Sequence, residues 1–308
     1  MTDIATKKKK KQLPKVVSLY ICLALLIIAI FLGKEIKAGI INGLRLSVMN
    51  VVPTLFPFFI LSDLWISSIE FNEKGLFARV FSGIFNISPC GLSAFIVGAV
   101  CGFPLGVKTA VDLFKQGKIN EKELSSLNGY VNNPSAAFVI SGIGAGMFGS
   151  LSLGIKLYLC TIFSAILTGI MFRPSSEKMN ITSVISGQTF SFVESVRSAA
   201  YSSINVCAYI IFFSGISALL STLIKNEILF TLISPFLELT SAGEKIYATR
   251  ITLGKLTNPL LAFALGFSGF SVHMQVFSFL PKEISKIKYL ITKFIQGFLS
   301  AIIIVFLT

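Results

Sequence analysis

Stretches free of charged residues, separated by short charged loops, run along most of the chain. Several of them reach the about 20 apolar residues that cross a bilayer as an α-helix. The longest are interrupted by glycine and proline, which weaken or break helices. The stretches without Asp, Glu, Lys or Arg are 16–32, 80–107, 124–155, 157–172, 198–224, 256–281 and 294–308. This pattern predicts an all-α polytopic membrane protein with about 7–9 membrane segments.

The order of these stretches divides the chain into a tail, a first span and two halves. Residues 1–15 form a basic tail, and Lys7–Lys11 predict that the N-terminus is cytoplasmic. Residues 16–33 are expected to be an uncleaved first span, because their apolar run is too long for a signal peptide and no small-residue cleavage site follows. The first half then covers 34–175, and the second covers 186–308.

Both halves begin with an amphipathic pattern and continue into apolar spans. Charged residues recur among apolar ones over 34–49, before a span at 50–68. In the second half, polar residues recur at spacings of three and four over 186–204. This spacing predicts an amphipathic helix, followed by a separate span at 205–224. A last span is predicted at 288–307.

Each half also contains a long apolar segment that is interrupted near its middle. The first break is Gly-Phe-Pro-Leu-Gly at 102–106, and the second is Gly-Phe-Ser-Gly-Phe-Ser at 266–271. Both segments carry the pattern Ala-Phe-x-x-Gly followed by Gly-Phe. Interrupted apolar segments at matching positions of two halves point to the binding site of a secondary transporter. We therefore predict two re-entrant helical hairpins, near 91–116 and near 257–281, in two pseudo-repeated halves.

Composition and charge narrow the function classes. The chain is 54% hydrophobic and 13% charged, whereas a soluble domain has about 25% charged residues. The net charge of +13 comes mostly from Lys and Arg between apolar stretches, where they anchor spans, so no nucleic-acid partner is expected. One histidine and five scattered cysteines indicate neither a metal site, nor a disulfide framework, nor a catalytic triad. We expect that the chain is not an enzyme and that it binds no cofactor. Whether transport is coupled to Na⁺ or H⁺ stays open.

Polar side chains gather at the breaks, where helix ends free backbone N–H and C=O groups. Lys108 follows the first break; it either pairs with Asp112, one turn further on, or faces the pocket and binds an anion. Asn132 and Asn133 either cap a helix before Pro134 or contact a solute. Both interpretations stay open for each position.

The second half offers three more candidates. Glu238 is a lone carboxylate after an apolar run, which is costly in a membrane. It either caps a helix, lies at a cytoplasmic edge, or serves a site or a coupling role. His273 and Gln275 follow the second break inside a charge-free stretch. His273 is either a packing residue or one that hydrogen-bonds a solute or relays a proton.

Five motifs carry a family resemblance. They resemble the sporulation integral membrane protein family of the YlbJ type, within the wider nucleoside-recognition (Gate) domain group. The similar region covers about 15–308, and the two broken segments are its most specific parts. The motifs are Gly-Phe-Pro-x-Gly-x-Lys at 102–108, Asn-Asn at 132–133, Gly-x-Gly-Met-Phe-Gly at 144–149, Glu-Leu-Thr-Ser at 238–241 and Gly-Phe-Ser-Gly-Phe-Ser-Val-His-x-Gln at 266–275.

The resemblance implies a fold similar to concentrative nucleoside transporters, with paired hairpins around the site. It also implies that dipicolinate, a planar aromatic dianion, is moved from the mother cell across the outer forespore membrane. Helix N-termini and Lys108 would hold its carboxylates, and Phe103 and Phe270 would stack on its ring. Ser241 stands where the family more usually has Asn. The candidate substrate-binding residues are Gly102, Phe103, Pro104, Gly106, Lys108, Asn132, Asn133, Glu238, Thr240, Ser241, Gly269, Ser271, His273 and Gln275.

Other functions stay open. A nucleoside carrier would need no cation, so an indispensable Lys108 would count against it. A non-transporting scaffold or assembly factor for sporulation would tolerate changes at the polar hairpin residues but not at its small packing residues. The expected partners are an anionic small molecule and the lipid bilayer, and a homo-oligomer stays open. The expected location is the outer forespore membrane or the cell membrane of a spore-forming bacterium.

Overall fold

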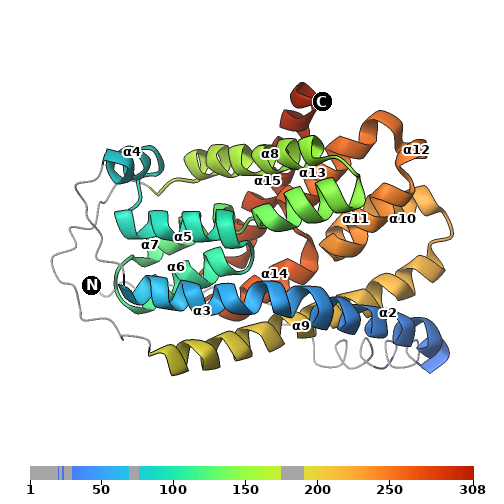
Figure 1. Ribbon diagram of the computed structural model, residues 1–308, viewed down its shortest axis with the longest axis horizontal. Helices are drawn as coiled ribbons and strands as arrows, with labels where there is room; N and C mark the ends of the chain where they lie inside the picture. The colour runs from blue at the N-terminus through green and yellow to red at the C-terminus, as the bar shows by residue number, and fades with distance from the viewer. Residues whose placement is uncertain (1–19, 21–22, 24–29, 69–75, 175–190) are drawn as a thin grey trace, which may run out of the picture.

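The computed structural model describes residues 20, 23, 30–68, 76–174 and 191–308 (Figure 1). These ranges fold into helices joined by short turns, without a β-strand. The predicted basic tail and most of the predicted first span lie outside the described residues.

The helices differ widely in length, and several meet at breaks of only one to a few residues. In chain order they are α2 (Gly33–Leu46), the π-helix η1 (Ser47–Val51), α3 (Val52–Ser68), α4 (Leu76–Phe85), α5 (Pro89–Cys101), α6 (Leu105–Lys115), α7 (Glu121–Tyr130), the π-helix η2 (Ala137–Met147), α8 (Leu151–Met171), α9 (Phe192–Leu223), α10 (Glu227–Leu237), α11 (Leu239–Ala248), α12 (Arg250–Leu253), the 3₁₀-helix η3 (Gly254–Leu256), α13 (Thr257–Phe267), α14 (Gly269–Phe279) and α15 (Lys286–Leu307).

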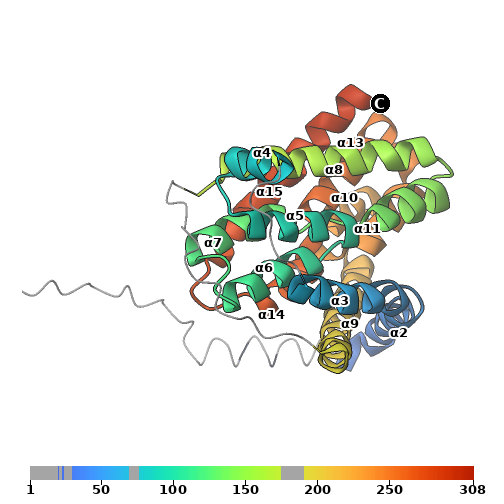
Figure 2. The same cartoon turned by 60° about the vertical axis from the view of Figure 1, so that its left-hand side comes forward.

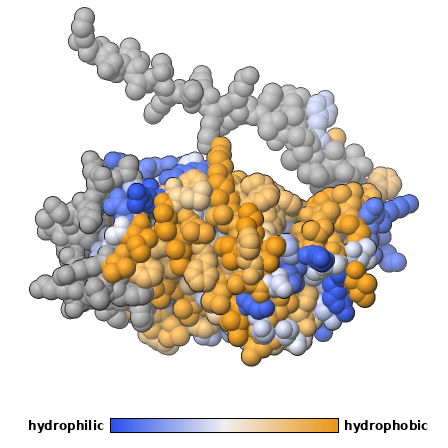
Figure 3. All heavy atoms as spheres, turned by 90° about the horizontal axis from the view of Figure 1, so that it is seen from above, coloured by the Kyte–Doolittle hydropathy of each residue, from blue (hydrophilic) through white to orange (hydrophobic). Residues whose placement is uncertain are grey.

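Four helical stretches within the described ranges are long and apolar enough to cross a membrane: α8, α9, the stretch Arg250–Phe279 and α15. Shorter apolar helices include α5, η2 and α10. Large apolar side chains are exposed along α8, α9 and α15, and apolar residues cover much of the face drawn in Figure 3. Such a surface suits lipid rather than water. The predicted fold class, an all-α polytopic membrane protein, is confirmed.

The helices α2 and α3 lie along α9 at one side of the molecule (Figures 1 and 2). A Cβ added at Gly39 would lie 2.6 Å from the Cβ of Ala218, and one added at Gly43 would lie 2.8 Å from the Cβ of Ser214. These two glycines, one turn apart, therefore let the backbones of α2 and α9 approach closely, as small residues do in membrane helix pairs.

The helix α9 differs from its prediction. It runs unbroken over 32 residues and starts at a capping box formed by Ser191 and Glu194. The amphipathic piece at 186–204 and the span at 205–224 were predicted as separate elements, but from Phe192 onward they are one helix. This helix packs against α2, α3, α10 and α14.

The same order of elements occurs twice in the chain. In the first half, the folded-back pair α5 and α6 precedes α7 and η2, which meet at a break, and then the long helix α8. In the second half, the folded-back pair α10 and α11 precedes α13 and α14, which also meet at a break, and then the long helix α15. The two long helices α8 and α15 pack against each other.

The second hairpin differs in position from its prediction at 257–281. There, α13 packs chiefly against α15, whereas α14 packs against α9 and α10, so the two arms diverge at Ser268. The arms that pack on each other in the second half are α10 and α11, on either side of Glu238. Re-entry of these arms from one side of a bilayer stays a prediction.

The largest apolar core joins both halves. It contains Tyr130 at the end of α7, Phe85 and Phe95 from α4 and α5, and Tyr289 from α15. The rings of Phe85 and Tyr130 stack with their centroids 5.5 Å apart. This core lies beside the break after α7 and holds that break in place.

Candidate functional site

The tip of the α5–α6 pair rests on the break after α7. A Cβ at Gly98 or Gly106 would clash with the carbonyl oxygen of Val131, so the two glycines let that carbonyl lie between the arms. Gly102 has a φ of +89°, and its Cβ would lie 2.7 Å from the backbone nitrogen of Ser135. Only glycine combines this φ with this contact.

The tip of the α10–α11 pair rests on the break between α13 and α14 in a similar way. Gly269 has a φ of +77°, and its Cβ would lie 3.2 Å from the carbonyl oxygen of Pro235. At the tip, the carboxylate of Glu238 accepts hydrogen bonds from the backbone N–H groups of Thr240, at 2.9 Å, and Ser241, at 2.7 Å. Glu238 therefore caps α11, as one interpretation of the sequence predicted.

A cavity of about 420 Å³ opens where these tips and breaks converge. Its wall includes residues beside the N-terminal ends of four helices: α6, η2, α11 and α14. No side chain caps α6 or α14, whereas at η2 the hydroxyl of Ser135 accepts a hydrogen bond from the backbone N–H of Phe138 at 3.2 Å. The lining residues at these ends are Gly102, Phe103, Ser135, Ala137, Leu239, Thr240, Ser271 and Val272.

The polar side chains in the wall are few. Within the part of the chain that the structure describes, Ser271 Oγ and Gln275 Oε1 are buried and have no hydrogen-bond partner. Two carboxylates, Glu238 and Glu244, also line the cavity, and no Lys or Arg appears among its described lining residues. Glu238 is 3% exposed, whereas Glu244 is exposed. The wall thus combines free acceptors, helix N-termini and one carboxylate already bonded to backbone N–H groups.

A second polar group, completely buried, joins the two halves behind these breaks. Asn132 Nδ2 donates to the hydroxyl of Tyr289 at 2.9 Å, and that hydroxyl lies 3.1 Å from His273 Nδ1. Lys293 Nζ donates to the carbonyl oxygen of Asn132 at 2.6 Å and to Gln296 Oε1 at 2.7 Å. We call this group the buried network; its members are Asn132, Asn133, His273, Tyr289, Lys293 and Gln296.

Asn133 closes the buried network on its other side. Its Oδ1 accepts from Gln296 Nε2 at 2.7 Å, and its Nδ2 donates to the Tyr130 carbonyl at 2.8 Å. Asn133, Lys293 and Gln296 are 0% exposed. Both asparagines therefore satisfy polar groups inside the protein, and neither is among the lining residues of the cavity.

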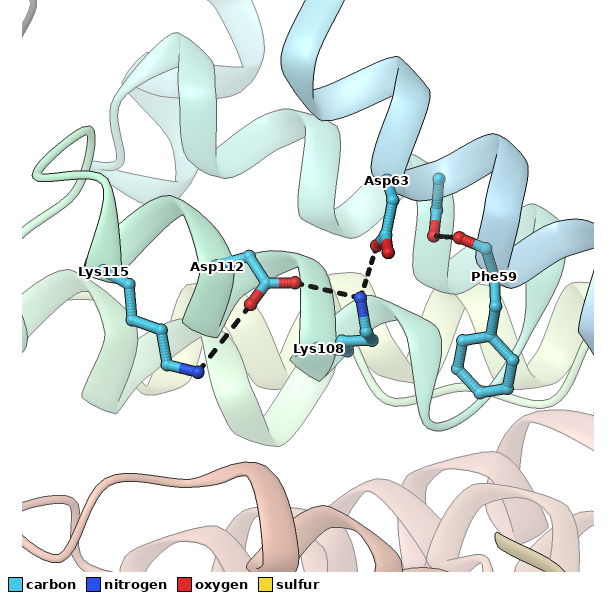
Figure 4. Close-up of polar contacts among 6 residues, drawn as sticks. Phe59, Asp63, Lys108, Asp112 and Lys115 are labelled. Atoms are coloured by element: carbon cyan, nitrogen blue, oxygen red, sulfur yellow. Dashed lines mark hydrogen bonds and ion pairs between the residues drawn. The ribbon is translucent and has the colours of Figure 1, made fainter. Parts of the chain in front are cut away.

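Lys108 belongs to a third group, an ion triad with Asp63 and Asp112. Figure 4 shows Lys108 between the two carboxylates, with Lys115 at the outer end of the row. Lys108 Nζ bonds Asp63 Oδ1 and lies 3.1 Å from Asp112 Oδ2, while Lys115 Nζ is 4.0 Å from Asp112 Oδ1. Of the two interpretations of Lys108, the structure supports the ion pair.

The structure thus divides the predicted site residues among three places. Gly102, Phe103, Glu238, Thr240, Ser271 and Gln275 line the cavity. Asn132, Asn133 and His273 belong to the buried network, and Lys108 belongs to the ion triad. The remaining predicted residues, Pro104, Gly106, Ser241 and Gly269, are not among the lining residues. Pro104 and Gly106 lie at the α5–α6 tip, Ser241 lies at the α10–α11 tip, and Gly269 lies at the break between α13 and α14.

Sequence reasoning missed six polar residues in these three places. Lys293, Gln296 and Asp63 carried a usable signal, since each is a polar or charged residue inside a predicted span, which is expensive in a membrane. Ser135 and Glu244 lie beside noted motifs, but nothing in the pattern directs them to the cavity. The hydroxyl of Tyr289 carried no signal of its own.

Comparison with known proteins gives one relative. The chain is 25% identical to the sporulation integral membrane protein YlbJ of Bacillus subtilis (strain 168), over 86% of this chain and 76% of that protein. No protein-family model matches the chain. No solved structure matches it.

Proposed function

The chain is a homologue of a YlbJ-type sporulation membrane protein, and on that premise we propose that it carries a small carboxylate-bearing solute across a membrane during sporulation. It acts as a carrier, not as an enzyme, and its partners are the solute and the bilayer. Its proposed location is the outer forespore membrane, with a cytoplasmic N-terminus.

The observation that carries this proposal is the cavity at the meeting point of four helix N-termini. Helix N-termini present N–H groups and partial positive charge, which favour carboxylates. Irregular backbone at membrane depth persists only inside protein or beside a cavity, and breaks of this kind form the sites of secondary transporters. Ser271 and Gln275 add buried polar atoms that have no hydrogen-bond partner in the described structure and could bond a solute.

Dipicolinate is the proposed solute. Binding cavities for small molecules measure roughly 300–1,000 Å³, so the cavity of about 420 Å³ accommodates a single aromatic ring with two carboxylates. Phe103 lines the cavity and offers a face for the ring; Phe270 is not among the lining residues. Because two glutamates also line the cavity, a dianion would move together with a cation, Na⁺ or H⁺.

A nucleoside is the second candidate solute, and one observation favours it. The described lining residues include two carboxylates and no Lys or Arg. A neutral solute would not be repelled by Glu238 and Glu244, and it could bond Ser271 and Gln275. The pairing of Lys108 with Asp63 and Asp112 removes the cation that would have argued against a nucleoside.

Uptake into proteoliposomes tests the proposal. The purified protein would be given labelled dipicolinate or a labelled nucleoside, beside Ser271→Ala, Gln275→Leu and the control Ser221→Ala on the exposed side of α9. Loss of one hydrogen bond to the solute should raise half-saturation about five- to tenfold in each cavity variant and leave the control unchanged. Uptake of the nucleoside alone would show that a nucleoside, not dipicolinate, is the solute. If folded protein took up neither compound, a non-transporting scaffold would be favoured instead.

Glu244→Gln separates the two solutes. Removing an exposed carboxylate at the cavity should speed dipicolinate uptake by about two- to tenfold at low salt, because like-charge repulsion is lost, and the gain should shrink as salt is added. Uptake of a neutral nucleoside should not respond. If the rate of dipicolinate uptake changed neither with the substitution nor with salt, dipicolinate would not be the solute of this cavity.

A further inference from the structure

The helix α14 contributes to both the cavity and the buried network. Ser271 and Gln275, one turn apart, line the cavity. His273 lies between them in sequence, about 200° around the helix from each, and contacts Tyr289 instead. The break after α7 also contributes to both sites. Ser135 lines the cavity, whereas Asn132 bonds Tyr289 and Lys293 in the buried network.

Lys293 is the unusual member of the buried network. It is 0% exposed, and the oxygens it bonds belong to a backbone carbonyl and an amide, which are neutral. No carboxylate among the described residues lies within ion-pair distance of it. A buried ammonium without a counter-charge lowers the stability of the fold. An apolar side chain would fill the same space without that cost, so packing alone does not explain a lysine here.

The surroundings of Lys293 contain few titratable groups. His273 on α14 lies close enough to interact electrostatically with it, and Tyr289 lies one turn before it on its own helix. His273 Nε2 is buried without a partner in the described structure. The helix α13 has no charged residue in Thr257–Phe267, and η2 has none in Ala137–Met147. From α8, the contact with the network is the carbonyl of Thr161, 3.4 Å from Gln296 Nε2, while Lys156 lies more than a turn away along that helix. The acidic residues of α7 lie at its far end, near Glu121.

We propose that Lys293 is a proton-binding site whose protonation is coupled to solute binding in the cavity. This inference rests on the proposed transport function. The amine takes up a proton from water, forming one N–H bond, when an anionic solute in the cavity supplies the missing negative charge. It returns that proton to water when the solute leaves. Proton and anion are therefore carried together, and the shared breaks at Asn132 and in front of α14 link the two sites.

Lys293→Met in proteoliposomes tests the coupling. Lys288→Met is the matched control, because Lys288 lies on the same helix but is half-buried at its start, with Nζ 3.4 Å from Ser125 Oγ. Two rates are measured with labelled dipicolinate: exchange at equal pH on both sides, and accumulation driven by an imposed pH gradient. Lys293→Met should keep exchange and lose accumulation by about tenfold or more. Lys288→Met should keep both. Accumulation by Lys293→Met equal to that of the wild type would overturn the proposal.

A second measurement does not depend on transport. The melting temperature of the purified protein is followed from about pH 6 to pH 9, because its slope against pH reports the protons that differ between folded and unfolded chains. Wild type and Lys293→Met should differ in slope, and Lys288→Met should follow the wild type. Equal slopes for all three would overturn the proton site. Different slopes in a protein that exchanges no solute would keep the proton site and overturn both the coupling to dipicolinate and the proposed function.

Discussion

The two buried lysines, Lys108 on α6 and Lys293 on α15, sit in contrasting surroundings. Lys108 bonds the carboxylates of Asp63 and Asp112, so its charge is more than compensated. Lys293 bonds only neutral oxygens among the described residues. The first lysine ties the arm α6 to α3, whereas the second holds the break after α7 to α15.

The contrast separates a structural charge from a functional one. A buried ion pair needs both partners, and its loss exposes an unpaired charge to a low-dielectric interior. A lone buried amine does not need a charged partner, because it can exist in the neutral form and take up a proton when its surroundings become more negative. The lysine that stands in the motif at 102–108 is thus the structural one, and the lysine outside every motif is the candidate for coupling.

The largest expected effect is at Lys108. Lys108→Met leaves Asp63, which is 0% exposed, without its cation, and leaves Asp112, which is 16% exposed, with only the distant Lys115. It should lower the free energy of unfolding by about 3–5 kcal/mol. Thermal unfolding of the purified protein in detergent measures this loss. The double variant Asp63→Leu with Lys108→Met should recover part of it, because one of the unpaired carboxylates is removed. A loss of less than about 1 kcal/mol for Lys108→Met would erase the contrast.

A smaller effect is expected at Lys293. Lys293→Met removes two hydrogen bonds, at a cost of about 1–3 kcal/mol, but also removes an uncompensated buried amine. The net change in the free energy of unfolding at neutral pH should stay within about 2 kcal/mol and below that of Lys108→Met. The same unfolding assay compares the two variants directly. A loss equal to that of Lys108→Met would mean that Lys293 carries a compensated charge.

The smallest effect is expected at the outer end of the triad. Lys115 is 67% exposed and 4.0 Å from Asp112, and exposed ion pairs contribute about 0–1 kcal/mol. Lys115→Ala should therefore change the free energy of unfolding by less than about 0.5 kcal/mol, and added salt should shrink the difference further by screening. A larger loss would show that the triad depends on its solvent-exposed member.

The positions of the helix breaks were well predicted from the sequence. Glycine, proline and asparagine mark the interruptions at 102–106 and 132–135, and helices end at both. The second interruption, 266–271, contains the break at Ser268, and Glu238 ends α10. The direction of the chain after each break was not predicted. The arms fold back at Glu238 and diverge at Ser268 because of the neighbours on which each arm packs.

The candidate site was predicted only in part. Gly102, Glu238, Ser271 and Gln275 lie around one cavity, as the two-hairpin interpretation required. Lys108, Asn132 and His273 stand near the same breaks in sequence but point elsewhere. Spacing along a helix tells which residues share a face, not which face meets the cavity, and a partner such as Asp63 is 45 positions away from Lys108.

By itself, the sequence determined that this is an all-α membrane protein with interrupted helices, because apolar run length and helix-breaking residues act locally. It also carried the likeness to the sporulation membrane proteins. Only the tertiary structure decided which breaks fold back, which polar residues line the cavity and which lysine has a counter-charge. These depend on contacts between segments far apart in the chain, where the burial of one side chain is set by whatever packs across from it.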